Sequence, residues 1–285
     1  MMKIIYPYYK HFSCIAEKCP RHCCAFRISF FKWEEELFGT KPEWNDVDGK
    51  GHDIKHYLLH DSKGWFCKNK SGGECIFMGE DHLCNIQKRF GQVALPSVCR
   101  TFPRMVTKYQ DHMEYALDSC CPVVAASVWN WKIGEFAIEG TPCDNDECDN
   151  DESVTDDLTY RRNAAMRILA DEKECFHDCL KNIADIFKCE IVIPDFHLSE
   201  DKLDFIRKQT LLLIWEDVLS HEHSTEGNVI ITLILQFITE YSKHLEEHDY
   251  ASHWEMSVDF ANRYSEFVIG TPIEPDDEKR FIDIS

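Results

Sequence analysis

The placement of the cysteines constrains this chain more than any other feature of its sequence. Ten of the fifteen cysteines lie within the first 121 residues, and four of them fall between Cys14 and Cys24. The others in this half are Cys67, Cys75, Cys84, Cys99, Cys120 and Cys121. Thiolates at such spacings can converge on a soft metal ion or an iron–sulfur cluster. The N-terminal half is therefore expected to fold around a centre that its sulfur atoms hold.

The rest of the composition favours a cytoplasmic globular protein. A chain of 285 residues is long enough to bury a core without cross-links. Its first ten residues contain no sustained apolar segment, and its longest apolar stretch, 229–238, is about half the length of a membrane span. An odd number of cysteines without an export signal indicates metal ligands rather than a disulfide scaffold.

The charge of the chain bears on its partners. The formal net charge is −20 at pH 7. So acidic a surface repels nucleic acid and anionic membranes, and it attracts polypeptides rich in lysine or arginine. Solubility alone is the plainer explanation of such a charge, so the charge by itself does not identify a partner.

Hydrophobic periodicity predicts a mainly α fold. Apolar residues at three- and four-residue spacing predict helices at 160–188, 200–219, 228–248 and 250–268, which would form a C-terminal bundle. In the irregular N-terminal half, alternating segments around 110–112 predict a small β-hairpin, and Pro122 predicts the start of a helix over 122–136. The expected domains are a cysteine-rich metal or iron–sulfur domain (1–140), an acidic linker (141–157) and a helical domain (158–285).

Four cysteine motifs follow one another in the N-terminal half. Cys-x4-Cys-x3-Cys-Cys starts at Cys14, Cys-x8-Cys-x-Ile-Gln at Cys75, Cys-Arg-Thr-Phe-Pro-Arg at Cys99 and Ser-Cys-Cys-Pro at Ser119. One zinc ion takes four protein ligands, whereas these motifs offer at least eight thiols. Two metal centres, or one cluster plus structural thiols, fit this number better than a single zinc ion.

In this order and at these spacings, the four motifs resemble the flagellin lysine N-methylase family of bacteria. That family is related to cysteine-rich domains described as zinc or iron chelators, and the resemblance covers about residues 12–127. It implies an enzyme that transfers methyl groups from S-adenosylmethionine to the ε-amines of flagellin lysines. It also implies a cysteine-bound centre, expected to be [4Fe–4S], with zinc as the alternative. The cysteines that match the family pattern are Cys14, Cys19, Cys23, Cys24, Cys75, Cys84, Cys99 and Cys121.

The residues for catalysis are less clear than the candidate metal ligands. The glycines form no loop of the kind that cradles a nucleoside in Rossmann-type enzymes, so no donor-binding site is predicted. Acidic and aromatic side chains can hold a lysine amine, but ordinary structural roles are commoner for such residues. Candidates near the motifs are Glu80, Asp81, Tyr109, Glu114, Tyr115 and Asp118.

Two other functions remain open on the sequence. Because no donor site is recognisable, the chain could be a metal-binding or iron–sulfur protein without catalysis. A third hypothesis is that the centre is a zinc ion with a purely structural role.

Overall fold

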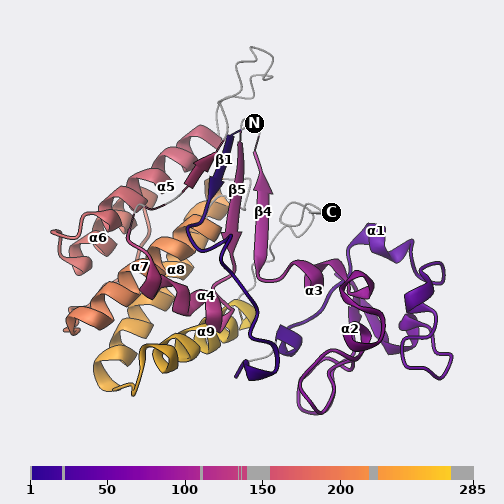
Figure 1. Cartoon of the computed structure of the whole chain (residues 1–285). Coiled ribbons are helices and arrows are strands. Elements are labelled where there is room, and N and C mark those ends of the chain that lie inside the picture. The colour runs from indigo at the N-terminus through magenta and orange to yellow at the C-terminus, as the bar shows by residue number, and fades with distance from the viewer. Residues whose placement is uncertain are drawn as a thin grey trace. The chain divides into compact units, whose positions relative to one another are not determined.

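Figure 1 shows the computed structural model of the chain, which describes residues 2–20, 23–109, 112–133, 135, 137–139, 155–217 and 224–270. The chain divides into two compact units. Among the described residues, the cysteine-rich unit is Ser13–Phe102, and the sheet-and-helix unit combines the residues up to Phe12 with those from Pro103 to 270. This division differs from the expected ranges 1–140 and 158–285, because the chain before Phe12 and after Pro103 packs with the long helices. Of the expected acidic linker, 141–154 lie outside the described residues.

A four-stranded sheet organises the sheet-and-helix unit, in the order β4-β5-β1-β6. The strands are β1 (Met2–Ile5), β4 (Arg104–Lys108), β5 (His112–Leu117) and β6 (Ala137–Glu139). β4 and β5 pair antiparallel and form the predicted hairpin. β1 pairs with β5 in parallel and with β6 antiparallel. These pairings link segments far apart in the chain, so no local pattern in the sequence predicts them.

Helices pack beside this sheet and on one another (Figure 1). They are α4 (Pro122–Ser127), α5 (Thr155–Ala170), α6 (Phe176–Phe187), α7 (Glu200–Asp217), α8 (Ser224–Glu247) and α9 (His253–Gly270). Apolar side chains of α5 and α7, Met166 and Trp215, meet Met105 and Ala116 of the hairpin. α4 packs on α9. The prediction of a mainly α fold is confirmed, and no helix in the described ranges is long and apolar enough to span a membrane.

The predicted helix over 160–188 is wrong in its continuity, because the chain breaks it into α5 and α6. The buried Arg207 of α7 explains the break. Its guanidinium donates to the carbonyl oxygens of Leu169 at 3.1 Å, Asp171 at 3.1 Å and Glu174 at 2.7 Å. These carbonyls lie at the end of α5 and in the segment after it, where helix carbonyls lack partners of their own. A side chain more than thirty positions later in the chain therefore fixes this helix end.

Two other helix boundaries differ from prediction. The helix that begins at Pro122 ends at Ser127, well before position 136, and one 3₁₀ turn (Val128–Asn130) follows it. α9 begins at His253 rather than near 250. The Ser252 hydroxyl accepts the Glu255 N–H at 3.2 Å, and the Glu255 carboxylate accepts a backbone N–H from Ala251 at 2.8 Å. This reciprocal arrangement resembles a capping box, which starts a helix.

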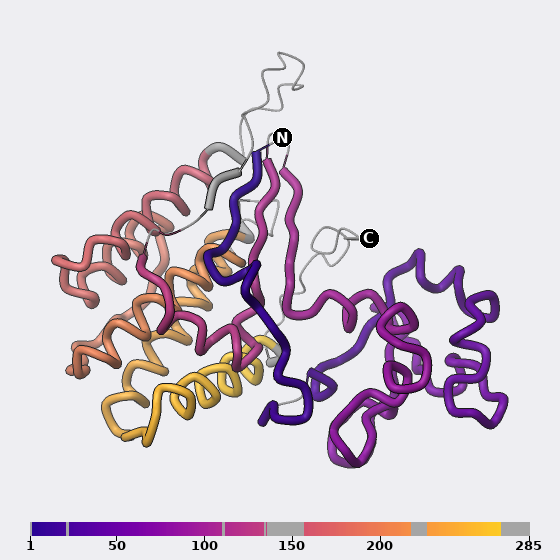
Figure 2. The backbone as a smooth tube through the Cα atoms, in the orientation of Figure 1, coloured from indigo at the N-terminus to yellow at the C-terminus, as the bar shows by residue number. Residues whose placement is uncertain are grey.

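The cysteine-rich unit consists mostly of turns, as Figure 2 shows for the indigo and purple part of the trace. Its regular elements are short: α1 (Lys32–Glu35), β2 (Leu58–Asp61), β3 (Gly64–Cys67), α2 (Asn85–Phe90) and α3 (Ser97–Thr101). β2 and β3 form a second, two-stranded antiparallel sheet. The core surrounds Trp44, whose indole N–H donates to the Ala94 carbonyl at 2.7 Å. The buried Glu34 carboxylate accepts the backbone N–H groups of Phe31 and Ser97, so it ties α1 to the start of α3.

Candidate metal centre

Thiols gather around the apolar core of the cysteine-rich unit. Cys67 and Cys75 are buried members of that core, and Cys24, Cys84 and Cys99 pack against it. The thiol of Cys23 lies in hydrogen-bond contact with that of Cys24. Five of these thiols belong to the predicted metal ligands, and Cys67 does not. The six thiols are those of Cys23, Cys24, Cys67, Cys75, Cys84 and Cys99.

Backbone hydrogen bonds bring three of these segments together. The N–H of Cys75 donates to the carbonyl of Cys24 at 2.7 Å. Cys67 ends strand β3, and its N–H donates to the Ile28 carbonyl at 2.9 Å. The segments around Cys24, Cys67 and Cys75 are therefore held side by side by main-chain contacts, independently of any metal.

Two short helices supply the other thiols. Cys84 is the residue that precedes α2, so the backbone N–H groups of Ile86 and Gln87 lie close to its sulfur and favour its thiolate. Cys99 lies inside α3 and is half-buried. Gly91 ends α2 with a φ of +81°, a backbone conformation that residues with a Cβ rarely adopt.

The thiols influence each other's ionisation. The hydrogen bond from Cys24 lowers the pKa of Cys23 to about 7 and raises the pKa of Cys24. In the same way, the hydrogen bond between Cys67 and Cys75 lowers the pKa of Cys75 and raises that of Cys67. Burial raises the pKa of Cys84 and Cys99, and neighbouring thiols add to the effect. Several thiolates so close repel one another, and a bound cation relieves that repulsion.

Three of the predicted ligands are not among these six thiols. Cys14 is exposed, and its sulfur accepts the Ala16 N–H at 3.4 Å. Cys19 is half-buried at the end of the 3₁₀ turn Ala16–Lys18. Cys121 belongs to the sheet-and-helix unit, where it is buried and precedes α4. The role of these three cysteines stays a prediction.

The six thiols are neighbours rather than a finished coordination shell. Within the described ranges, no group of three or more His, Cys, Asp or Glu side chains is arranged so that it could hold a metal ion. The donor chemistry nevertheless fits a soft metal, because five of the six thiols belong to one core or pack against it and the sixth, Cys23, contacts Cys24. The sequence motifs could not have indicated Cys67, since it stands alone between them.

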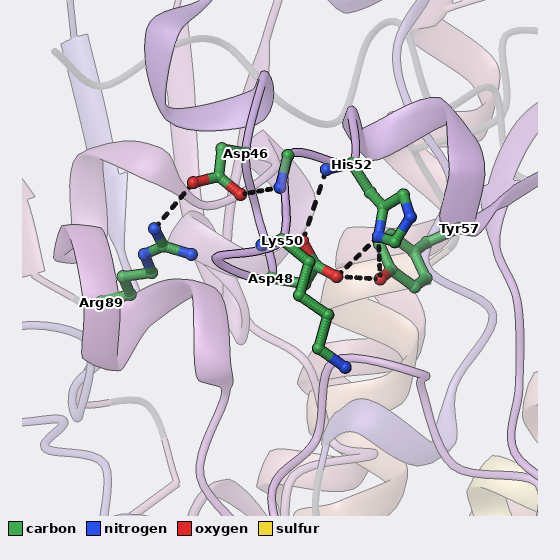
Figure 3. Close-up of polar contacts among 7 residues, drawn as sticks. Asp46, Asp48, Lys50, His52, Tyr57 and Arg89 are labelled. Carbon is green, nitrogen blue, oxygen red and sulfur yellow. Dashed lines mark hydrogen bonds and ion pairs between the residues drawn. The ribbon is translucent and has the colours of Figure 1, made fainter.

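A second polar cluster lies in the loop before β2 (Figure 3). The Asp48 carboxylate lies 2.7 Å from His52 Nδ1 and accepts the Tyr57 hydroxyl at 2.7 Å. It also accepts the backbone N–H of Lys50 at 2.9 Å. Burial would raise the pKa of Asp48, but these hydrogen bonds outweigh it and hold the pKa well below its usual range. Asp48 is therefore ionised and keeps its loop closed on Tyr57.

The neighbouring Asp46 connects the same loop to α2 (Figure 3). Its carboxylate accepts the Gly51 N–H at 2.7 Å and pairs with the Arg89 guanidinium at 2.9 Å. Both contacts lower the pKa of Asp46, the Gly51 bond most strongly. Because α2 begins directly after Cys84, this loop helps to position one side of the thiol group.

Several candidates for holding a lysine amine have structural contacts instead. Glu114 is buried in the sheet-and-helix unit in a bidentate ion pair with Arg162, at 2.6 and 2.8 Å. Asp81 pairs with Lys88 at 2.9 Å on the surface of the cysteine-rich unit. Asp118 accepts the backbone N–H of Cys120 at 2.8 Å. These contacts support ordinary structural roles for Glu114, Asp81 and Asp118.

Comparisons with known proteins give this arrangement a family context. A Lysine-N-methylase of Salmonella choleraesuis is 29% identical over 122 residues, which are 42% of this chain and 30% of that protein. The flagellar biosynthetic protein FliU of Salmonella muenchen is 29% identical over 123 residues, which are 42% of this chain and 72% of FliU. Over this segment, the chain is similar to proteins named Lysine-N-methylase and FliU.

The similarity to this family is partial. A Lysine-N-methylase of Salmonella typhimurium is 28% identical over 121 residues, again 30% of that protein's length. The matched part of the chain thus spans less than a third of the two methylases. No family model and no solved structure matches the chain.

Proposed function

We propose that the chain is a cytoplasmic protein-lysine N-methyltransferase. It would transfer methyl groups from S-adenosylmethionine to lysine side chains of flagellin and carry a cysteine-bound metal centre. The observation that carries this proposal is the similarity to proteins named Lysine-N-methylase and FliU. The group of thiols in the cysteine-rich unit supports the metal centre.

The charge of the chain suits a lysine-bearing substrate. Its net charge of −20 attracts the ammonium groups of a basic protein segment over distances of about a Debye length. Methyl transfer forms a nitrogen–carbon bond and breaks the sulfur–carbon bond of the donor's sulfonium. The lysine amine must first lose its proton, because an ammonium has no free electron pair.

The candidate ligands of the centre are the eight cysteines that the family resemblance implies. Five of them support the proposal best: Cys24, Cys75, Cys84 and Cys99 belong to one core or pack against it, and Cys23 contacts Cys24. An iron–sulfur cluster, expected to be [4Fe–4S], would supply a redox-active centre, whereas zinc would supply a structural cross-link. In either case the sulfur atoms would connect segments that regular secondary structure does not connect.

The second candidate function is a metal-binding or iron–sulfur protein without catalysis. It is favoured by the partial match, since about 70% of each Lysine-N-methylase has no counterpart in the aligned segment. Calorimetry with S-adenosylmethionine separates the two functions. A methyltransferase binds the donor and releases or absorbs heat, whereas a chelator gives no saturable signal.

The direct test is a methylation assay with purified chain, purified flagellin and isotopically labelled S-adenosylmethionine. The proposal predicts labelled mono- or dimethyl-lysine in the flagellin peptides, detected by mass spectrometry. Flagellin with chemically acetylated lysines is the control, because its blocked amines cannot accept the methyl group. Unmodified flagellin, after incubation with folded and metal-loaded chain, contradicts the proposed activity.

A further inference from the structure

Cys67 lies outside every cysteine motif of the sequence, yet its side chain lies among the motif thiols. It is 1% exposed and belongs to the core that also contains Cys75. Its thiol lies in hydrogen-bond contact with that of Cys75. The sulfur atoms of Cys84 and Cys99 are also close enough to act on it electrostatically.

This environment differs from that of an ordinary buried thiol. Cys179 of α6 provides the comparison, because it is also fully buried. Its sulfur contacts the Ile168 carbonyl and the Arg207 guanidinium, both at 3.6 Å, as a weak polar group in a helical core does. Cys67 instead has a second thiol as its hydrogen-bond partner. Thiolates are ligands that soft metal ions select, and two contacting thiols offer two such donors at one place.

The backbone around Cys67 and Cys75 is held firmly on both sides. Lys68, directly after Cys67, donates its N–H to the Tyr57 carbonyl at 2.9 Å. Its own carbonyl accepts the N–H of Ile76, directly after Cys75, at 2.8 Å. The two cysteines therefore stand next to residues that bond each other, and their pairing follows from the backbone. Ligands that the fold positions in advance bind a metal with a smaller entropic cost.

We propose that Cys67 and Cys75 bind the metal centre as a pair, with Cys67 as a ligand outside the family motifs. The inference rests on the proposed metal centre but not on the methyltransferase activity. Each of the two thiols would lose its proton to solvent, and two metal–sulfur bonds would replace the hydrogen bond between the sulfur atoms. The step involves no oxidation or reduction.

Cobalt binding to the full chain tests the proposal. The metal-free protein is titrated with Co²⁺ without oxygen, and the absorption from sulfur-to-cobalt charge transfer measures thiolate ligation. We expect Cys67→Ala and Cys67→Ser to lose charge-transfer intensity and to weaken Co²⁺ binding by more than about tenfold. Loss of a residue that only hydrogen-bonds to a metal ligand already weakens metal binding by about tenfold or more, and loss of a ligand should cost at least as much. Cys179→Ala is the control for loss of a buried thiol and should bind as the unaltered chain does.

The outcomes separate this inference from the proposed centre. If Cys67→Ala binds Co²⁺ with unaltered affinity and intensity, Cys67 is not a ligand. If the unaltered chain binds neither Co²⁺ nor Zn²⁺ and, purified without oxygen, holds no iron–sulfur cluster, the proposed centre fails and this inference fails with it. Methylation of flagellin is not needed for either reading.

A second measurement avoids variants that fail to fold. Diamide oxidises two neighbouring thiols to a disulfide and takes up their two hydrogen atoms. In the unaltered chain, we expect it to link Cys67 to Cys75 in the metal-free protein and much less in the Zn²⁺-loaded protein, as peptide mass spectrometry can show. Equal cross-linking in both forms contradicts the proposal.

Discussion

Replacement of Arg162 by methionine probes the ion pair that joins the sheet to α5. Glu114 of β5 and Arg162 of α5 are 4% and 2% exposed, and their two hydrogen bonds measure 2.6 and 2.8 Å. The guanidinium also lies 4.5 Å from the ring centroid of Trp215. Methionine preserves most of the apolar volume, so the substitution removes mainly the charge and its hydrogen bonds.

The expected loss of stability follows from the burial of the carboxylate that remains. Removal of one partner of a buried ion pair costs about 3–5 kcal/mol, because the other charge is left unpaired. His112 lies 3.1 Å from Glu114 and can still donate one hydrogen bond, which favours the lower end, about 3 kcal/mol. An exposed pair gives the contrast. Arg263 is 45% exposed beside Asp259, so Arg263→Met should cost only about 0–1 kcal/mol.

Urea denaturation at pH 7 and at lower pH measures both variants. Burial alone would raise the pKa of Glu114, but Arg162 outweighs it and lowers the pKa below 4.5. The stabilisation by the pair is therefore present above pH 4.5 and is lost as the pH falls through the lowered pKa. The difference in the free energy of unfolding between Arg162→Met and the unaltered chain should therefore become smaller as the pH is lowered. A loss below about 1 kcal/mol at pH 7, or a pH-independent loss, would refute this reasoning.

Three further predictions concern single positions. Burial raises the pKa of Glu216 well above 4.5, so this group makes folding less favourable as the pH rises above that value. Glu216→Gln can keep both bonds to Ser119. In urea titrations from about pH 5 to 8, it should therefore weaken the dependence of the free energy of unfolding on pH. Gly91→Ala should lower the free energy of unfolding by about 1–3 kcal/mol in the same assay, because φ is +81° at this position. Gly72 has no positive φ, so Gly72→Ala should lower the free energy of unfolding by less. Trp44→Ala should cost about 3–5 kcal/mol through its cavity and its lost bond to Ala94, and an unchanged denaturation midpoint contradicts that core role.

The sequence predicted the elements whose signal is local. The apolar periodicity of α7, α8 and α9 and the alternation in β4 and β5 lie within each segment, so these elements were found. Features fixed by distant residues were missed. The end of α5 depends on Arg207. β1 and β6 form only by pairing with strands far away in the sequence, since β1 covers Met2–Ile5 and its partner β6 covers Ala137–Glu139.

The candidate site shows the same limit. The cysteine motifs indicated Cys75, Cys84 and Cys99, which the structure places around one core. They could not indicate Cys67. It joins the group of six thiols because the backbone of β3 bonds to Ile28 and because a turn leads from β3 to Cys75. Nor could the motifs distinguish Cys121 from the other motif cysteines, although Cys121 lies in the sheet-and-helix unit.

The metal and sulfide content of the full chain, purified without oxygen, tests the proposed centre most directly. Iron with acid-labile sulfide indicates a cluster, and zinc without sulfide indicates a zinc site. The proposal predicts one of these results, with the metal lost from a Cys75→Ser, Cys99→Ser double variant and retained in Cys179→Ala. Folded protein that contains neither iron nor zinc and binds neither on addition contradicts it.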